Sequence, residues 1–90
     1  MSKVVLITGA SSGIGATIAE YLFLKDYIVY GTSRNPKDAV VNGVHMLALD
    51  VTKSETISKA ITSLLEKEGR IDVLINNAGM GITGSLEETR

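Results

Sequence analysis

The stretch Thr8-Gly9-Ala10-Ser11-Ser12-Gly13-Ile14-Gly15 follows directly after the apolar run Val4–Ile7. A short apolar run that leads into a glycine-rich turn, with a helical pattern behind it, is typical of a parallel strand that ends at a phosphate-binding turn. The first amides of the following helix then point at the phosphates, and the helix dipole favours the negative charge. The sequence therefore predicts a nucleotide phosphate site close to the N-terminus.

The three glycines of this turn serve different purposes. Gly9 can adopt backbone angles that a Cβ would forbid, so the chain can leave the strand sharply. Gly13 lets the backbone approach a pyrophosphate closely, and Gly15 lets the helix pack tightly on the strand. Ser11 and Ser12 supply hydroxyl donors, and Ser12 is also a suitable helix cap. A purely structural glycine turn is the alternative interpretation.

Four nearly continuous apolar runs recur along the chain, as expected of strands that are covered on both faces. The runs are Val4–Ile7, Ile28–Tyr30, Val44–Leu49 and Ile71–Ile75, and helical patterns lie at Gly13–Lys25 and Thr52–Gly69. Strands that alternate with helices predict a parallel sheet with right-handed crossovers. We predict an α/β fold, the first half of a Rossmann-type doubly wound parallel sheet, with the strands in the order 3-2-1-4.

Local signals refine the segments between these runs. The first helix should bury one face, formed by Ile14, Ile18, Ala19, Leu22 and Phe23. The second should begin at a capping box, Thr52-Lys53-Ser54-Glu55, and end at Gly69. Its buried stripe should be Ile57, Ala60, Ile61, Leu64 and Leu65. Residues 35–43 have the composition of a surface loop.

The bulk composition excludes several classes of protein. The chain has 90 residues, a formal net charge of −1, no cysteine and a single histidine, so a disulfide framework and a His/Cys metal site are both excluded. The nine basic residues are scattered, so no nucleic acid partner is expected. No segment approaches the ~20 apolar residues of a membrane span. We expect a protein of the cytoplasm without a membrane partner and without a metal.

Two motifs together resemble the short-chain dehydrogenase/reductase family. They are the T-G-x-x-x-G-x-G spacing of residues 8–15 and the segment Asn76-Asn77-Ala78-Gly79 after the fourth strand, and the resemblance covers Lys3 to about Glu88. It implies an oxidoreductase that transfers hydride between a nicotinamide dinucleotide and a small carbonyl or alcohol substrate. It also implies that the complete enzyme is a homo-oligomer.

The resemblance assigns a role to each matching position. The pyrophosphate would be lined by Gly9, Ser11, Ser12, Gly13, Ile14 and Gly15. The adenine would be held by Asp50 and Val51, and Asn77, Ala78 and Gly79 would lie beside the adenosine ribose. Asn76 would tie the central strands together. The alternative for Asp50 is a carboxylate that is simply solvated or that supports the helix cap at Thr52.

The end of the second strand predicts which nicotinamide cofactor binds. An acidic side chain there binds the ribose 2′-hydroxyl of NAD, whereas an arginine accommodates the 2′-phosphate of NADP. Here the strand ends in Ser33-Arg34, and no Asp or Glu occurs from Tyr27 through Lys37. A guanidinium is a permanently charged fork that suits a phosphate. The sequence therefore predicts NADP(H) in preference to NAD(H), with a solvated Arg34 as the alternative.

No catalytic residue is assigned within the chain. The resemblance implies a Ser and a Tyr-x-x-x-Lys pair, which in this family lie further downstream, beyond Arg90. Tyr21 and Lys25 have that spacing, but they fall on the helix after the phosphate turn, and we interpret them as ordinary helix residues. His45 is interpreted as an ordinary residue near the start of the third strand.

The end of the sequence predicts an incomplete domain. Ser85-Leu86-Glu87-Glu88 reads as a capping box, yet only about one helical turn follows it. We expect residues 1–90 to be the truncated N-terminal part of one NAD(P)-binding Rossmann domain, with a frayed tail as the alternative. The run Val73-Leu74-Ile75 would then be an open sheet edge. Two rival functions are a non-catalytic nucleotide-binding module and a half-domain that assembles with a partner.

Overall fold

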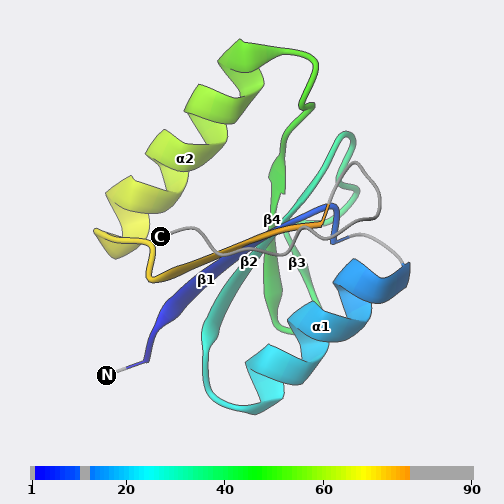
Figure 1. Cartoon of the computed structure of the whole chain (residues 1–90), viewed down its shortest axis with the longest axis vertical. Coiled ribbons are helices and arrows are strands. Elements are labelled where there is room, and N and C mark those ends of the chain that lie inside the picture. The colour runs from blue at the N-terminus through cyan, green and yellow to red at the C-terminus, as the bar shows by residue number, and fades with distance from the viewer. Residues whose placement is uncertain (1, 11–12, 78–90) are drawn as a thin grey trace.

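The computed structural model describes residues 2–10 and 13–77, which form one twisted sheet with a helix on each face (Figure 1). In chain order its elements are β1 (Val4–Thr8), α1 (Gly13–Leu24), β2 (Ile28–Ser33), β3 (Val40–Val41), β4 (Val44–Ala48), α2 (Ser54–Glu68) and β5 (Val73–Asn76). The predicted helix start near Leu86 lies outside the described residues, as do Ser11, Ser12, Ala78 and Gly79.

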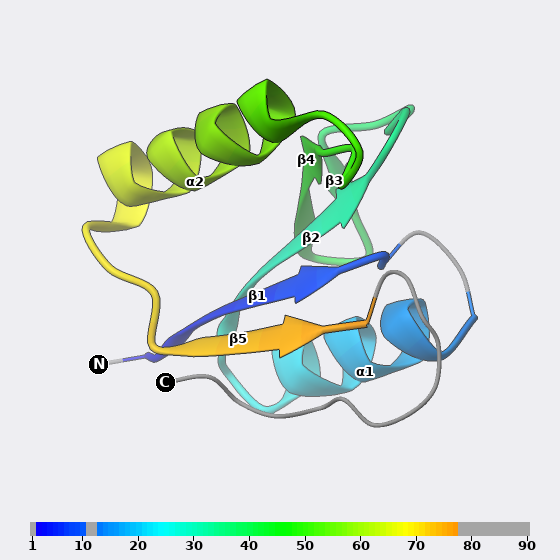
Figure 2. The same ribbon diagram turned by 45° about the horizontal axis from the view of Figure 1, so that its top comes forward.

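The sheet has the order β3-β4-β2-β1-β5. The pairs β1–β2, β1–β5 and β2–β4 are parallel, so all four long strands end at the same edge of the sheet (Figure 2). Their order along the sheet is the predicted 3-2-1-4, and the α/β Rossmann-type class is confirmed. Within the described residues, β5 pairs only with β1 and forms one edge of the sheet.

One element was missed by the loop prediction for residues 35–43. The two residues of β3 pair antiparallel with β4, which adds a fifth strand at the opposite edge. The turn between them is Asn42-Gly43, and both residues have positive φ angles, 52° and 86°. Such a pair is the preferred two-residue connection of a hairpin, because its twist matches that of the strands. The short edge strand follows from that turn.

The alternation of side chains along β1 creates two core layers. Val5 and Ile7 lie in one layer, and Val4 and Leu6 lie in the other, and all four side chains are buried. The first layer continues to Ala19 of α1, so α1 covers that face of the sheet. The second continues to Leu64 of α2, which covers the opposite face (Figure 1). Burial on both faces explains why the strands are apolar without interruption.

The face of α1 that packs on the sheet is partly different from the predicted one. Gly15 and Ala19 are its buried residues, whereas Ile14 is 72% exposed and Phe23 is 42% exposed. The prediction was wrong at these two positions because it searched for large apolar side chains, and this helix approaches the sheet through small ones. The helix also ends at Leu24, so Lys25 lies one residue beyond it.

The two ends of α2 agree unequally with the sequence. The expected capping box is not formed, because the helix begins at Ser54 and its N-cap residue is Lys53, which makes no side-chain capping bond. Gly69 does end the helix, in a left-handed conformation (φ 82°), and its N–H donates to the carbonyl of Leu65. Of the predicted stripe, Ala60 and Leu64 are buried and Ile61 is partly buried. Ile57 and Leu65 are on the exposed margin.

Across residues 2–10 and 13–77, the helices are all too short or too polar to cross a membrane.

Candidate functional site

The site is the edge of the sheet at which the four parallel strands end. The register places Thr8 of β1 level with Asn76 of β5, and Ser33 of β2 level with Ala48 of β4. Gly9, Arg34, Asp50 and Asn77 follow these strand ends. The structure therefore brings the described part of the predicted site together along one edge, and the helix start at Gly13 faces the same side (Figure 2).

The phosphate turn is anchored to β2 by a buried threonine. Gly9 has a φ of 70°, as predicted for a sharp exit from the strand. Its N–H donates to Oγ1 of Thr32 at 3.1 Å, and the N–H of Ala10 donates to the carbonyl of Thr32 at 2.9 Å. Thr32 is 2% exposed, and the sequence prediction missed it. The only signal was a polar residue next to the last position of a strand that begins with an apolar run.

The glycines at the start of α1 differ in what surrounds them. A Cβ on Gly15 would lie 2.2 Å from the carbonyl oxygen of Gly9 and 2.6 Å from Nδ2 of Asn77, so only glycine fits between the helix and the turn. Gly13 has a φ of 64°, and a Cβ there would meet nothing within 4 Å. The tight packing predicted for Gly15 is thus present, and the space beside Gly13 is open.

Asn77 fastens the end of β5 to the phosphate turn. Its Nδ2 donates to the carbonyl of Gly9 at 3.0 Å, and its backbone N–H donates to Oγ1 of Thr8 at 2.9 Å. The hydroxyl of Thr8 in turn donates to Oδ1 of Asn76 at 3.0 Å. Both asparagines therefore hold β1 and β5 together at this edge, although the resemblance assigned that role to Asn76 alone.

Asp50 is used by the turn that follows β4. Its Oδ1 accepts hydrogen bonds from the hydroxyl of Thr52 at 2.6 Å and from the backbone N–H of Thr52 at 2.9 Å. These bonds lower the pKa of Asp50, and the positive charges of Lys53 and Arg34 lower it further. The supporting role that we left open for Asp50 is therefore present. Val51, the next residue, is exposed.

Arg34 lies directly beyond β2 and is exposed. Its guanidinium is close enough to Asp50 to help lower the pKa of that carboxyl group. The strand ends of β2 and β4 are joined beside it, because the N–H of Leu49 donates to the carbonyl of Ser33 at 3.0 Å. A permanent cation is thus held at the carboxyl end of β2, between the phosphate turn and the Asp50 turn.

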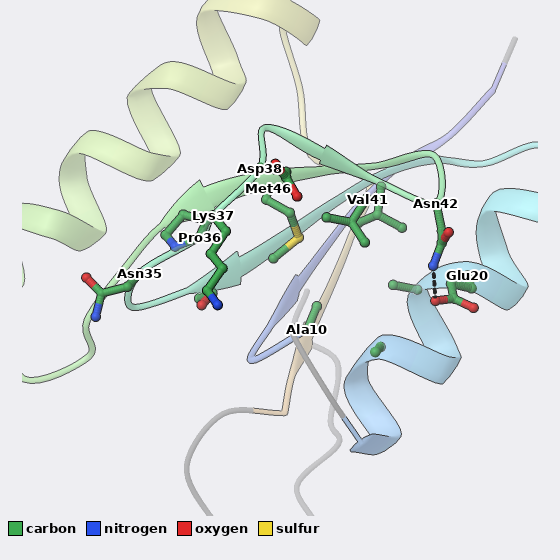
Figure 3. A pocket seen from close by; sticks show the side chains of 13 residues that line it. Ala10, Glu20, Asn35, Pro36, Lys37, Asp38, Val41, Asn42 and Met46 are labelled. Atoms are coloured by element: carbon green, nitrogen blue, oxygen red, sulfur yellow. Dashed lines mark hydrogen bonds between the residues drawn. The ribbon is translucent and has the colours of Figure 1, made fainter.

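A cavity of about 490 Å³ opens between α1 and residues 33–46 (Figure 3). Ala10, Ala16 and Ala19 form its wall on the side of the turn and helix, and Asn35, Pro36 and Lys37 line the side of the β2 end. Across the opposite side, Nδ2 of Asn42 donates to Oε2 of Glu20 at 2.7 Å. The sequence prediction missed this cavity, since it treated residues 35–43 only as a surface loop.

The Tyr-x-x-x-Lys spacing in α1 lies away from this edge. Tyr21 is eight residues beyond the start of the helix, about 12 Å along its axis, and its side chain is 58% exposed. Nζ of Lys25 lies 5.4 Å from the centre of the Tyr21 ring, so the two residues interact with each other on the helix surface. This placement agrees with the interpretation of Tyr21 as an ordinary helix residue, whereas Lys25 lies just beyond the helix end.

His45 is an exposed residue near the start of β4, and its ring stacks on Tyr30 at 4.8 Å between centroids. The hydroxyl of Tyr30 donates to Oε2 of Glu68 at 2.7 Å. Burial and this carboxylate raise the pKa of Tyr30 to about 12, so the phenol stays neutral. Among residues 2–10 and 13–77, no group of three or more His, Asp or Glu side chains could hold a metal ion.

The chain belongs to the short chain dehydrogenase family, whose sequence profile matches residues 3–90. A curated relative, 3-ketodihydrosphingosine reductase of Bacteroides thetaiotaomicron, is 51% identical over 85 residues. That match covers 94% of this chain and 31% of the relative. The chain thus spans about a third of the length of this relative.

Two solved structures place the fold beside bound nicotinamide dinucleotides. ElxO with NADP bound has a TM-score of 0.77 and 35% identity, over 93% of this chain and 38% of that one. A 4-hydroxyisoleucine dehydrogenase complexed with NADH has a TM-score of 0.74 and 30% identity, over 88% of this chain and 34% of that one. Both cofactors therefore occur among structural neighbours of this chain.

Proposed function

We propose that this chain is the cofactor-binding half of an NADP(H)-dependent oxidoreductase, which transfers hydride between the cofactor and a carbonyl or alcohol substrate. Family membership supports the reaction class. The ketone reduction named for the Bacteroides relative supports a carbonyl substrate. By this proposal the chain alone binds the dinucleotide without turning over substrate.

The residues present fit a dinucleotide. The cradle between Gly9 and Gly15 has no room for a Cβ, whereas the space beside Gly13 at the helix start is open, as close approach of a phosphate requires. We propose that Gly9, Gly13, Ile14 and Gly15, together with Ser11 and Ser12, line the pyrophosphate. Ile14 is exposed at this end of α1, where its side chain can cover a bound ligand.

The adenosine half would lie further along the same edge. We propose that Asp50 and Val51 hold the adenine and that Asn77, Ala78 and Gly79 lie beside its ribose. Both hydrogen bonds from Thr52 go to Oδ1 of Asp50, and by this proposal the other carboxylate oxygen, Oδ2, binds the adenine. The exposed apolar side chain of Val51 suits one face of a base.

The observation that carries the cofactor preference is the end of β2. Ser33 and Arg34 offer a hydroxyl and a fixed positive charge where a 2′-phosphate would lie, and no acidic residue occurs from Tyr27 through Lys37 to bind a ribose diol instead. An NADP-bound neighbour supports this preference. An NADH-bound neighbour shows that the fold alone does not decide it.

The nicotinamide supplies the hydride when the cofactor is bound. The residues of this chain bind and orient the cofactor. The turn amides and the helix start neutralise the pyrophosphate, Arg34 selects the phosphorylated ribose, and Asn77 keeps the turn and the end of β5 in register. We assign no proton transfer to Tyr21, Lys25 or His45.

A charge reversal at Arg34 tests the cofactor preference. We expect R34D, in the complete protein as encoded, to weaken NADPH binding by at least tenfold and to leave NADH binding equal or tighter. Isothermal titration calorimetry with both cofactors measures this, with K59D on the exposed surface of α2 as the matched charge control. An unchanged preference in R34D would sink the assignment.

A second candidate function is a half-domain that assembles with a partner. The edge position of β5 favours it, since Val73, Leu74 and Ile75 are only partly buried and β5 pairs on one side within the described residues. Sedimentation of the 90-residue chain discriminates the two candidates. A concentration-dependent dimer supports assembly through this edge, and a monomer at high concentration argues against it.

From the sequence we also propose a cytoplasmic location and a homo-oligomeric complete enzyme.

A further inference from the structure

The cavity beside α1 is bounded by short side chains on the side of the turn and the helix. Ala10, Ala16 and Ala19 line it from the turn and the helix. Gly31 of β2 lies behind it, and a Cβ there would come within 2.6 Å of the Cβ of Ala10 and 3.3 Å of the sulfur of Met46. The cavity is therefore bounded by short side chains on one side, and it extends to Ser33 at the end of β2.

The segment that closes the cavity is held at its far end. Asn42 is hydrogen-bonded to Glu20 at 2.7 Å, and Gly43 is packed so tightly against the ring of Phe23 that a Cβ would lie 2.4 Å from it. The N–H of Met46 also donates to the carbonyl of Ala39 at 2.7 Å. These contacts tie the hairpin to α1 and β4, at the far end of the segment that begins at Arg34.

The charges of the cavity are divided between its two sides. Figure 3 shows Asn35, Pro36 and Lys37 on one side and Asn42 with Glu20 on the other. The carboxylate of Glu20 is engaged by Asn42. Lys37 and Asp38 also line the cavity, and Figure 3 shows the Asp38 carboxylate beside Met46 and Lys37 on the side of Asn35 and Pro36. Outside the cavity, the charge of Arg34 acts on Asp50, which follows the end of β4.

We propose that Lys37 is a second specificity-determining cation for the cofactor's 2′-phosphate, which it approaches from the cavity while Arg34 approaches from the side of Asp50. This inference rests on the proposed function and adds a residue to it. The negative charge of Asp50 also lies near the Arg34 guanidinium. A phosphate carries nearly two negative charges at neutral pH, and a second cation on the opposite flank matches that charge.

The experiment compares single variants in the complete protein as encoded, with NADPH and NADH as probes. We expect K37A to weaken NADPH binding by about tenfold, the value of one hydrogen bond between charged groups, and to leave NADH binding unchanged. K37R should keep most of the NADPH affinity. K59A removes an exposed lysine from α2 and should change neither affinity. The NADPH affinity of K37A should also depend less steeply on salt than that of the unmodified protein.

The outcomes separate this inference from the proposed function. If R34A weakens NADPH selectively but K37A does not, Lys37 has no such role and the cofactor preference stands. If K37A weakens both cofactors equally, the lysine acts only through the loop, and the inference is overturned. If the unmodified protein does not favour NADPH, both proposals are wrong.

Discussion

The two helices pack on the sheet by opposite means. α1 approaches through Gly15 and Ala19, and its large side chain Ile14 faces outward. α2 packs through Ala60 and the fully buried Leu64, with charged residues on its outer face. Close approach in α1 brings the helix start against the phosphate turn, where Gly15 meets Gly9. The sequence of α1 is therefore shaped by the site, and that of α2 by the core.

The largest loss of stability is expected from truncation of the buried Leu64 in α2. Leu64 is 0% exposed and packs with Val4, Leu6 and Tyr30. We expect L64A to lower the free energy of unfolding by about 3 kcal/mol, because it leaves a cavity under α2. Urea denaturation measures the loss. The ratio of NADPH to NADH affinity, measured without urea on the folded variant, should not change. A changed ratio would show that α2 also affects cofactor binding.

A substitution in α1 should lower both the stability of the fold and the affinity for NADPH. G15A places a Cβ against the carbonyl oxygen of Gly9, so the helix must shift away from the turn. We expect a stability loss of about 2 kcal/mol and at least a tenfold loss of NADPH affinity. G69A, at the residue that ends α2, is the matched control, because Gly69 has a φ of 82° and open space around it. It should cost about 1 kcal/mol without a change in affinity.

Removal of one hydrogen bond at the site and of one under α2 should have smaller effects on stability. N77A removes the bond from Nδ2 to the carbonyl of Gly9, and Y30F removes the bond from Tyr30 to Glu68 under α2. Each should lower stability by about 1 kcal/mol. We expect only N77A to weaken NADPH binding, by a few-fold, in the same titration. Equal affinities for the two variants would contradict the role of Asn77 in the turn.

The smallest effect is a pH dependence at the amino ends of β1 and β5, opposite to the strand ends that form the site. Oδ2 of Asp72 accepts from the backbone N–H of Val4 at 2.7 Å and from Nε of Arg70 at 2.9 Å. The bond from Val4 is the main reason that the pKa of Asp72 is lowered, and the charge of Arg70 adds to it. A carboxyl group with a lowered pKa stabilises the fold above its unfolded pKa, near 4, and loses this effect as the pH falls through its folded pKa.

D72N removes that titration. We expect the variant to be less stable than the unmodified protein at pH 7 and the difference to shrink below pH 4. Urea denaturation at pH 7, 5 and 3 measures it. A difference that stays constant with pH would show that the charge of Asp72 does not matter. Binding of NADPH should be unaffected, since the contacts of Asp72 lie at the amino ends of β1 and β5, away from the site.

Features that leave a direct record in composition, such as buried strands and a helix end, were predictable from the sequence. The apolar runs became parallel strands in the expected order, because burial on both faces leaves a direct record in composition. Gly69 was identified correctly because a helix end needs a left-handed residue. The face of α1 was predicted incorrectly at Ile14 and Phe23, since periodicity of large side chains cannot reveal packing through glycine and alanine.

Other features depend on contacts between distant residues. Thr32 holds Gly9 across 23 positions, and Asn77 holds it across 68, and neither pairing is visible without the fold. The hairpin at Asn42-Gly43 was missed although its turn signal was present, because β3 has only two residues. The capping box failed because Asp50 and Thr56 organise the turn before α2 and shift the helix start to Ser54.

We propose that the end of β2 makes this an NADP(H) site. The most direct test of this proposal is calorimetric titration of the complete protein as encoded with NADPH and with NADH, at low and at high salt. We predict that NADPH binds at least tenfold more tightly at low salt and that the gap narrows as salt screens the phosphate contacts. Equal affinities, or tighter binding of NADH, would contradict the account.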